Sequence, residues 1–145
     1  MTALRAISAG ATYSLRRLVL RSGDMTADVA FPQDENLDAF HLGAFDHELV
    51  GIASFSPTPT RYREGSVAWQ LRGMAIAHAQ QGKGIGAQIV AAAVERLRNE
   101  GASVLWCNAR DSAAAFYEKL GFVTEGDGFT TEATGLPHHV MVLDL

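Results

Sequence analysis

Three glycines alternate with other residues in the stretch QQGKGIGAQIV, residues 80–90. Gly82, Gly84 and Gly86 surround Lys83 and lead into a run with helical periodicity. Glycine at this density lets backbone N–H groups come close to a ligand, and the N-terminus of a helix favours an anionic one such as phosphate. The stretch therefore predicts a phosphate-binding turn at the start of a helix.

Two common phosphate motifs do not fit this turn. A P-loop requires G-x-x-x-x-G-K-[ST], but no glycine lies five residues before Gly82, and Gly84 stands where Ser or Thr would bind magnesium. A dinucleotide fingerprint requires G-x-G-x-x-G after a first strand and an acidic residue about twenty positions later. The glycines here follow G-x-G-x-G in mid-chain, and the region near Ser103 has no carboxylate at a strand end. Both motifs are disfavoured.

A third interpretation includes the residue before the glycines. Residues 81–86, QGKGIG, fit the pattern Q/R-x-x-G-x-G/A between a strand, LRGMAIA, and a helix. Residues 112–122, SAAAFYEKLGF, fit a second pattern, A-x-x-F-Y-x-K-x-G-F, one strand later. The pair resembles the acetyl-CoA motif and the second signature of the GNAT (GCN5-related) N-acetyltransferases. The resemblance covers residues 67–123 with specificity, and the N-terminal half agrees in element order only.

The resemblance implies acetyl-CoA as the acyl donor, bound in a V-shaped cleft between two parallel strands that part near Gly73. Backbone groups of the first strand would pair with the pantetheine arm, N–H groups of the glycine stretch would hold the pyrophosphate, and an Asn past the next strand would bond to the pantetheine. The residues so implied are Met74, Ala75, Ile76, Gln81, Gly82, Lys83, Gly84, Ile85, Gly86, Ala87 and Asn108.

Tyr117 matches a tyrosine that, in the family this chain resembles, lies beside the thioester sulfur and protonates the leaving thiolate. A phenol with a pKa near 10 suits that task, because it stays protonated until the charge develops. The alternative role for Tyr117 is a core aromatic on an amphipathic helix. The adjacent Phe116 fits that role better.

The base that deprotonates the acceptor amine is left open. Many members of the family place a Glu early on the fourth strand, where this chain has Gln70, whose amide cannot take up a proton at neutral pH. The remaining options are His41, His138, His139 or a water. His138 and His139 are adjacent in a strand, so only one of them can face the cleft.

Other reactive or charged side chains have plainer explanations. Cys107 in LWCNA fits a small buried residue better than an acyl-accepting nucleophile, because nothing nearby in the sequence would lower its pKa. Four arginines near the expected acceptor site could attract a carboxylate-bearing acceptor, although solvation at the surface is the commoner fate of such residues. They are Arg61, Arg63, Arg72 and Arg110.

The elements that must position these residues follow from periodicity and turn chemistry. We expect strands near residues 3–8, 39–45, 49–57, 67–77, 103–109, 122–126 and 138–145, and helices over residues 10–23, 84–101 and 112–120, the last capped by Asp111. Gly73 interrupts its strand, which indicates a bulge. The order predicts an α+β fold with a mixed β-sheet flanked by helices, and the resemblance adds splayed parallel central strands.

Composition narrows the classes of protein. The 145 residues, 48% of them hydrophobic, suit one domain over residues 1–145. A net charge of −4 without a basic cluster disfavours nucleic acid as a partner. One cysteine excludes an intrachain disulfide and a cysteine-based zinc site, and we expect no metal. No signal peptide or membrane-spanning run is evident, so a cytoplasmic protein is expected.

The function expected from these observations is transfer of an acetyl group from acetyl-CoA to an amine by direct attack through a tetrahedral intermediate. The acceptor, a small molecule or a peptide, is not indicated, and homodimerisation is left open. The alternative is a non-catalytic acyl-CoA-binding sensor, which the absence of a carboxylate at Gln70 favours and the presence of Tyr117 and Asn108 opposes.

Overall fold

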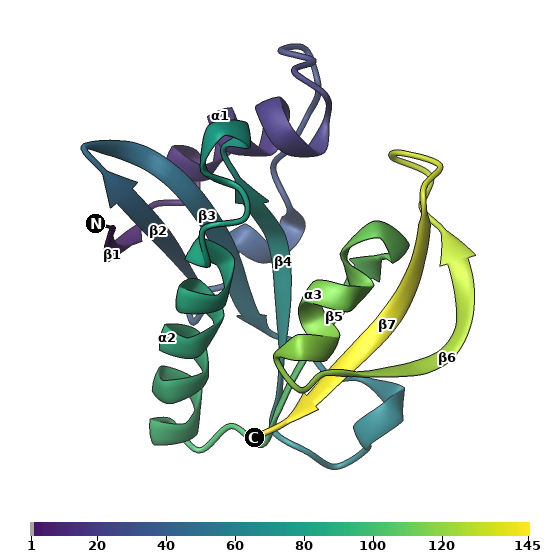
Figure 1. The fold of residues 1–145 in the computed structure, drawn as a ribbon. Helices are drawn as coiled ribbons and strands as arrows, with labels where there is room; N and C mark the ends of the chain where they lie inside the picture. The colour runs from purple at the N-terminus through teal and green to yellow at the C-terminus, as the bar shows by residue number, and fades with distance from the viewer. Residues whose placement is uncertain (1) are drawn as a thin grey trace.

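A computed structural model describes residues 2–145 as one mixed sheet with helices on both of its faces (Figure 1). The strands are β1 (Ala3–Ile7), β2 (Phe40–Asp46), β3 (Glu48–Pro57), β4 (Ala68–Ile76), β5 (Val104–Arg110), β6 (Val123–Thr130) and β7 (Pro137–Asp144). The α-helices are α1 (Tyr13–Leu15), α2 (Ile85–Asn99) and α3 (Ala114–Lys119). The predicted α+β class with a mixed sheet is confirmed.

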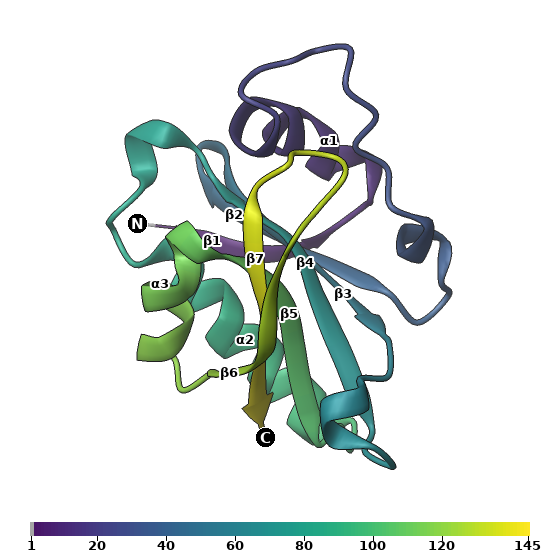
Figure 2. The same ribbon diagram turned by 90° about the vertical axis from the view of Figure 1, so that its right-hand side faces the viewer.

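The sheet has the strand order β1-β2-β3-β4-β5-β7-β6, and β4 pairs with β5 in parallel while the other neighbouring pairs are antiparallel. Helix α2 connects β4 to β5, which makes the crossover that parallel strands require. In Figure 2, α2 and α3 lie on one side of the sheet, and the segment of residues 10–35 lies on the other. Both faces of the sheet are therefore covered by helical segments.

Helix α2 forms because its apolar residues recur on one face. Four residues of this face are buried, each at most 4% exposed, and they pack on the β-strands of the main core: Ile85, Ile89, Ala93 and Leu97. The helix begins after Gly84 and ends before Gly101, and both glycines have positive φ. Gly101 is thus the predicted stop signal at the C-terminal end.

The N-terminal helical segment differs from the single helix expected over residues 10–23. It consists of a 3-10 turn (Gly10–Thr12), α1 and a π-helical turn (Arg16–Leu20). Leu18 is 45% exposed, whereas Arg16 is fully buried. The π-turn rotates the face that the segment presents to the sheet, and the ion pair that Arg16 makes there decides which side is buried.

Four further 3-10 turns complete the chain: Pro32–Glu35, Arg61–Arg63, His78–Gln80 and Asp111–Ala113. Asp111 does not cap α3 as expected, because no side chain caps that helix and the Asp111 carboxylate bonds to His139 instead (2.7 Å).

Candidate functional site

The two central strands separate halfway along their length. β4 and β5 pair only from Ala68 opposite Val104 to Leu71 opposite Cys107. Just beyond, β4 has one residue more than β3, and Gly73 there has a φ of +63°. This is the β-bulge that Gly73 predicted, and it turns β4 away from β5, so the expected splay is confirmed (Figure 1).

A cavity of about 280 Å³, which we call the cleft, lies in this splay. Its walls come from both faces of the sheet: α3 on one side, and the end of the N-terminal helical segment with Phe31 on the other. The loop before β7 closes one end. The lining residues used below are Arg21, Gln70, Arg72, Met74, Cys107, Asn108, Arg110, Phe116, Tyr117 and His138.

The edge of β4 along the splay presents backbone groups toward the cleft. The N–H of Ala77 donates to the carbonyl of Val50 on β3 (2.8 Å), so alternation points the polar groups of Ala75 at β3 and those of Met74 and Ile76 toward β5. Ala75 is 2% exposed and packs beneath Leu15. Of the three residues implied for the pantetheine, Met74 lines the cleft, the polar groups of Ile76 point the same way beyond its lining, and those of Ala75 point at β3.

The glycine turn, residues 81–87, carries unbonded donors. Gln88 donates the first helical N–H bond, to the Gly84 carbonyl (3.1 Å), and the six N–H groups of residues 82–87 find no acceptor anywhere in residues 2–145. Gly82 and Gly84 each have a φ of +80°, which only glycine adopts without strain. The positive end of the α2 dipole adds to these donors. The turn can bind a pyrophosphate without losing any existing bond.

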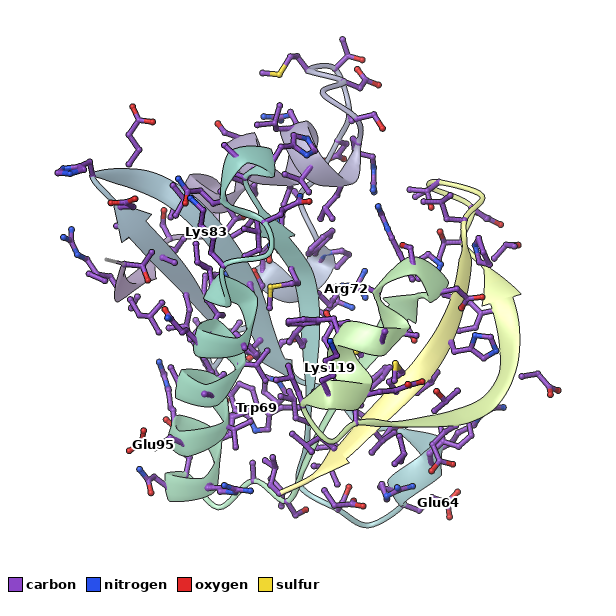
Figure 3. The ribbon with its side chains drawn as sticks, viewed as in Figure 1. Glu64, Trp69, Arg72, Lys83, Glu95 and Lys119 are labelled. Carbon is purple, nitrogen blue, oxygen red and sulfur yellow. The ribbon has the colours of Figure 1, made fainter. Side chains whose placement is uncertain are left out.

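Two residues of the turn, Gln81 and Gly86, have additional roles that the motif did not indicate. The N–H of Gln81 already donates to the carbonyl of His78 (3.4 Å), and its side chain donates to the carbonyl of Ile76 (3.0 Å), so Gln81 fixes the turn to the end of β4. The Lys83 amine lies at the surface near Gln80 (3.3 Å; Figure 3). A Cβ on Gly86 would lie 3.0 Å from the Phe116 ring, so this glycine allows α2 to approach α3.

Tyr117 lies on α3 at the wall of the cleft and is 5% exposed. Burial raises the pKa of Tyr117 well above its ordinary value, and the neighbouring Cys107 raises it further. Burial likewise raises the pKa of Cys107 to about 12, although the neighbouring Tyr117 acts to lower it. Tyr117 is therefore protonated at neutral pH, and Cys107 is a thiol rather than a nucleophilic thiolate.

The structure separates the three candidate histidines. His138 is 7% exposed and lines the cleft, and its Nδ1 lies 2.8 Å from the Leu136 carbonyl. Because that carbonyl can only accept, Nδ1 carries the proton and Nε2 has a free lone pair. His41 bonds to Ser54 (2.6 Å), away from the cleft, and His139 bonds to Asp111 (2.7 Å). Gln70 is 2% exposed and lies on the β4 wall of the cleft.

A wider groove of about 730 Å³ adjoins the cleft and shares Asn108 with it. Its walls are aromatic, and a bulge in β6 opens it, because the pairing of β6 with β7 is interrupted between Glu125 and Phe129. A Cβ on Gly126 would overlap the Tyr62 hydroxyl, which explains the glycine there. The principal walls are Arg61, Tyr62, Trp106, Asp127 and Phe129.

A buried ionic cluster behind the cleft was not evident from the sequence. The Arg16 guanidinium donates to both oxygens of Asp34 (2.8 and 3.0 Å), to the Val29 carbonyl (2.9 Å) and to Ser54 Oγ (2.8 Å). It also lies over the Phe31 ring at 3.9 Å. Nothing in the local sequence indicated that Arg16 is buried, because the periodicity of its segment assigns this arginine to the surface. The cluster holds Phe31 against the cleft.

Residues 2–145 lack two kinds of feature. No group of three or more His, Cys, Asp or Glu side chains is arranged to hold a metal ion. Over the same residues, no helix combines the length and the hydropathy needed to cross a bilayer.

Comparisons with known proteins agree with this geometry. A family model described as an acetyltransferase (GNAT) domain matches residues 26–145. An uncharacterized N-acetyltransferase, YitI of Bacillus subtilis (strain 168), is 32% identical over 143 residues, 98% of this chain and 95% of YitI.

Two solved structures share the fold. FeeM, an N-acyl amino acid synthase from uncultured soil microbes, superposes with a TM-score of 0.82 at 18% identity and covers 99% of this chain and 91% of its own. An aminoglycoside 6'-N-acetyltransferase complexed with coenzyme A superposes with a TM-score of 0.76 at 16% identity and covers 98% and 96%.

Proposed function

The chain belongs to the GNAT family of acetyltransferases, enzymes that take their acyl group from acetyl-CoA, and from this premise we propose that it acetylates an amine by direct attack within the cleft. The observation that carries the proposal is the run of six unbonded N–H groups in residues 82–87, next to the splay of β4 and β5. It supplies donors for the pyrophosphate at the start of α2, while Tyr117 lies at the wall of the cleft.

In this proposal the pantetheine arm of the donor lies along β4 and bonds to the backbone of Met74 and to the N–H of Ile76, with Asn108 on the opposite strand. The thioester sulfur then lies beside Tyr117. The donor binds as a substrate, so these contacts position its carbonyl for attack.

The acceptor nitrogen attacks the thioester carbonyl and forms a tetrahedral intermediate, which collapses with loss of the CoA thiolate. The Tyr117 hydroxyl gives its proton to that thiolate, and His138 Nε2 takes a proton from the nitrogen. Exchange with solvent then restores the neutral imidazole and the phenol, so one amine hydrogen is formally transferred to the thiol. Support for His138 is its free Nε2 lone pair at the wall of the cleft.

Tyr117→Phe should lower kcat about 100-fold and leave the Kd of acetyl-CoA unchanged, because the variant loses only the proton donor. The measurement is thiol release from acetyl-CoA against a panel of amines. Since the raised pKa keeps Tyr117 protonated, wild-type kcat should not fall between pH 7 and 9 through this group. Tight CoA binding with no turnover on any amine, and no effect of the variant, would instead indicate the sensor function.

His138→Gln should lower kcat/KM at neutral pH by about 10-fold to 100-fold, since the variant lacks the group that removes the amine proton. The loss should shrink at high pH, where more of the amine is already deprotonated. His139→Gln is the matched control, because His139 is the adjacent residue and bonds to Asp111. Equal pH profiles for the two variants would exclude His138 as the base.

A further inference from the structure

The charge on the walls of the cleft is one-sided. Arg21, Arg72 and Arg110 line it, and no Asp or Glu of the described chain does. Glu132 belongs to the loop whose neighbours line the cleft, but its own side chain is exposed and lies outside the lining. A cavity with three guanidinium groups is unexpected in a chain of net charge −4. The arrangement favours an anion in this position.

Arg72 is the guanidinium whose charge is least compensated. It lies on β4 where the bulge begins, between that strand and the helix across the splay (Figure 3), with its guanidinium 4.8 Å from the Phe31 ring centroid. The same ring lies 3.9 Å from Arg16, but the charge of Arg16 is balanced by Asp34 at 2.8 Å. Within residues 2–145, Arg72 has no hydrogen-bond acceptor or carboxylate partner, and its Nε is buried.

A buried donor without an acceptor destabilises a protein, so the position calls for a ligand that supplies one. A planar guanidinium is a fork of N–H donors, and that of Arg72 lines the cleft beside the Phe31 ring. Such a fork matches the two oxygens of a carboxylate, or two oxygens of a phosphate, in bidentate geometry.

Arg110 supplies a second group on the opposite wall. It lies on β5, where the register places it beside His138, and one of its N–H groups donates to the Leu20 carbonyl (2.9 Å). Arg21 bonds weakly to the same carbonyl (3.4 Å). These bonds hold both side chains at the cleft and use only one donor of each. Both side chains line the same cavity as Arg72.

We propose, on the premise of the acyl transfer argued above, that the acceptor is an amine that also carries an anionic group, a carboxylate in first place, and that Arg72 and Arg110 bind this group. The phosphates of the donor are already served by residues 82–87, which leaves the arginines for the acceptor. The same positive charges repel a simple cationic amine, so they select for the anion and favour the deprotonated nitrogen that attacks.

The test compares matched pairs of acceptors in the thiol-release assay. Phenylalanine is compared with phenethylamine, which lacks only the carboxylate, and phosphoethanolamine with ethanolamine. We expect the anionic member of at least one pair to have a kcat/KM about 30-fold higher. The better anionic probe identifies the group as carboxylate or phosphate. If phenethylamine and ethanolamine are both turned over as fast as, or faster than, their anionic partners, the inference is overturned.

Variants then locate the preference. Arg72→Gln should raise KM for the preferred anionic acceptor about 30-fold and bring the paired rates together, while Arg72→Lys, which keeps the charge without the fork, should fall between. Arg98→Gln, an exposed arginine on α2, is the matched control. The Kd of CoA should stay the same in all of them. Loss of CoA binding in Arg72→Gln would assign Arg72 to the donor and overturn the inference.

Calorimetric titration of the CoA-loaded protein with phenylalanine and with phosphoethanolamine separates this inference from the proposed function. Binding that is lost in Arg72→Gln supports the anionic site even where no amine is turned over, and in that case only the acyl transfer fails. Turnover of amines without any dependence on Arg72 or on an anionic group leaves the acyl transfer in place and sinks the inference.

Discussion

Gly84→Asp is expected to weaken acetyl-CoA binding about 1000-fold. The substitution places a carboxylate at the start of α2, beside the N–H groups that we assign to the pyrophosphate. Two like charges about 4 Å apart repel by about 4 kcal/mol at the effective dielectric constant of a protein surface, which corresponds to roughly three powers of ten in Kd. Titration calorimetry with acetyl-CoA measures the loss.

Gly84→Asn is the matched control, because it adds almost the same volume without the charge. A φ of +80° strains Asn and Asp alike, and a Cβ at Gly84 meets no heavy atom of the described residues within 4 Å, so the backbone strain is matched between the two variants. Asp at the N-terminus of a helix even stabilises it. Similar affinities for the two variants, or unchanged affinity in Gly84→Asp, would remove the pyrophosphate from this turn.

Asp34→Ala should lower the free energy of unfolding by about 3–5 kcal/mol, because it leaves a buried cation without its counter-charge. Arg16 is fully buried and Asp34 is 6% exposed, and the two are joined by two hydrogen bonds. Urea denaturation monitored by circular dichroism gives the value. Asp38→Ala, an exposed carboxylate on the same loop, should change stability little.

The double variant Arg16→Met, Asp34→Leu tests the cause. Apolar residues of similar volume remove both charges together, so it should be much more stable than Asp34→Ala. A double variant as unstable as the single one would show that packing, and not the unpaired charge, accounts for the loss.

Acid should weaken the same cluster. Burial acts to raise the pKa of Asp34, but the bonds from Arg16 and from the Phe31 N–H, with the charge of Arg16, outweigh it and lower the pKa overall. Its contribution is therefore complete above the ordinary carboxyl pKa and is lost as pH falls through the folded value. Burial lowers the pKa of His41. Its protonation in the unfolded chain therefore weakens folding as the pH falls below the ordinary pKa of histidine.

Local motifs made much of the fold and the donor site predictable. The apolar stripe and the glycines of α2 act within one helix, and the two signatures around residues 81–86 and 112–122 specify backbone conformations over a few residues. For that reason the order of strands and helices along the chain, the bulge at Gly73 and the splay agree with expectation.

The remaining features depend on pairs of residues far apart in the chain. Arg16 is buried only because Asp34 and Ser54 meet it, and no periodicity in its own segment indicates this. Ala75 faces β3 because of the register of a neighbouring strand. The choice among three histidines likewise required their partners, Leu136, Ser54 and Asp111, to be placed in space.

The parted strands also bear on the order of events during turnover. Because the cleft is walled by α3 on one face of the sheet and by Phe31 and Arg72 on the other, it passes through the sheet. Two substrates can then meet from opposite sides, and neither has to leave before the other arrives. Such a passage suits direct transfer within a ternary complex, without a covalent acyl-enzyme intermediate. The raised pKa of Cys107, which keeps it a thiol, is consistent with this.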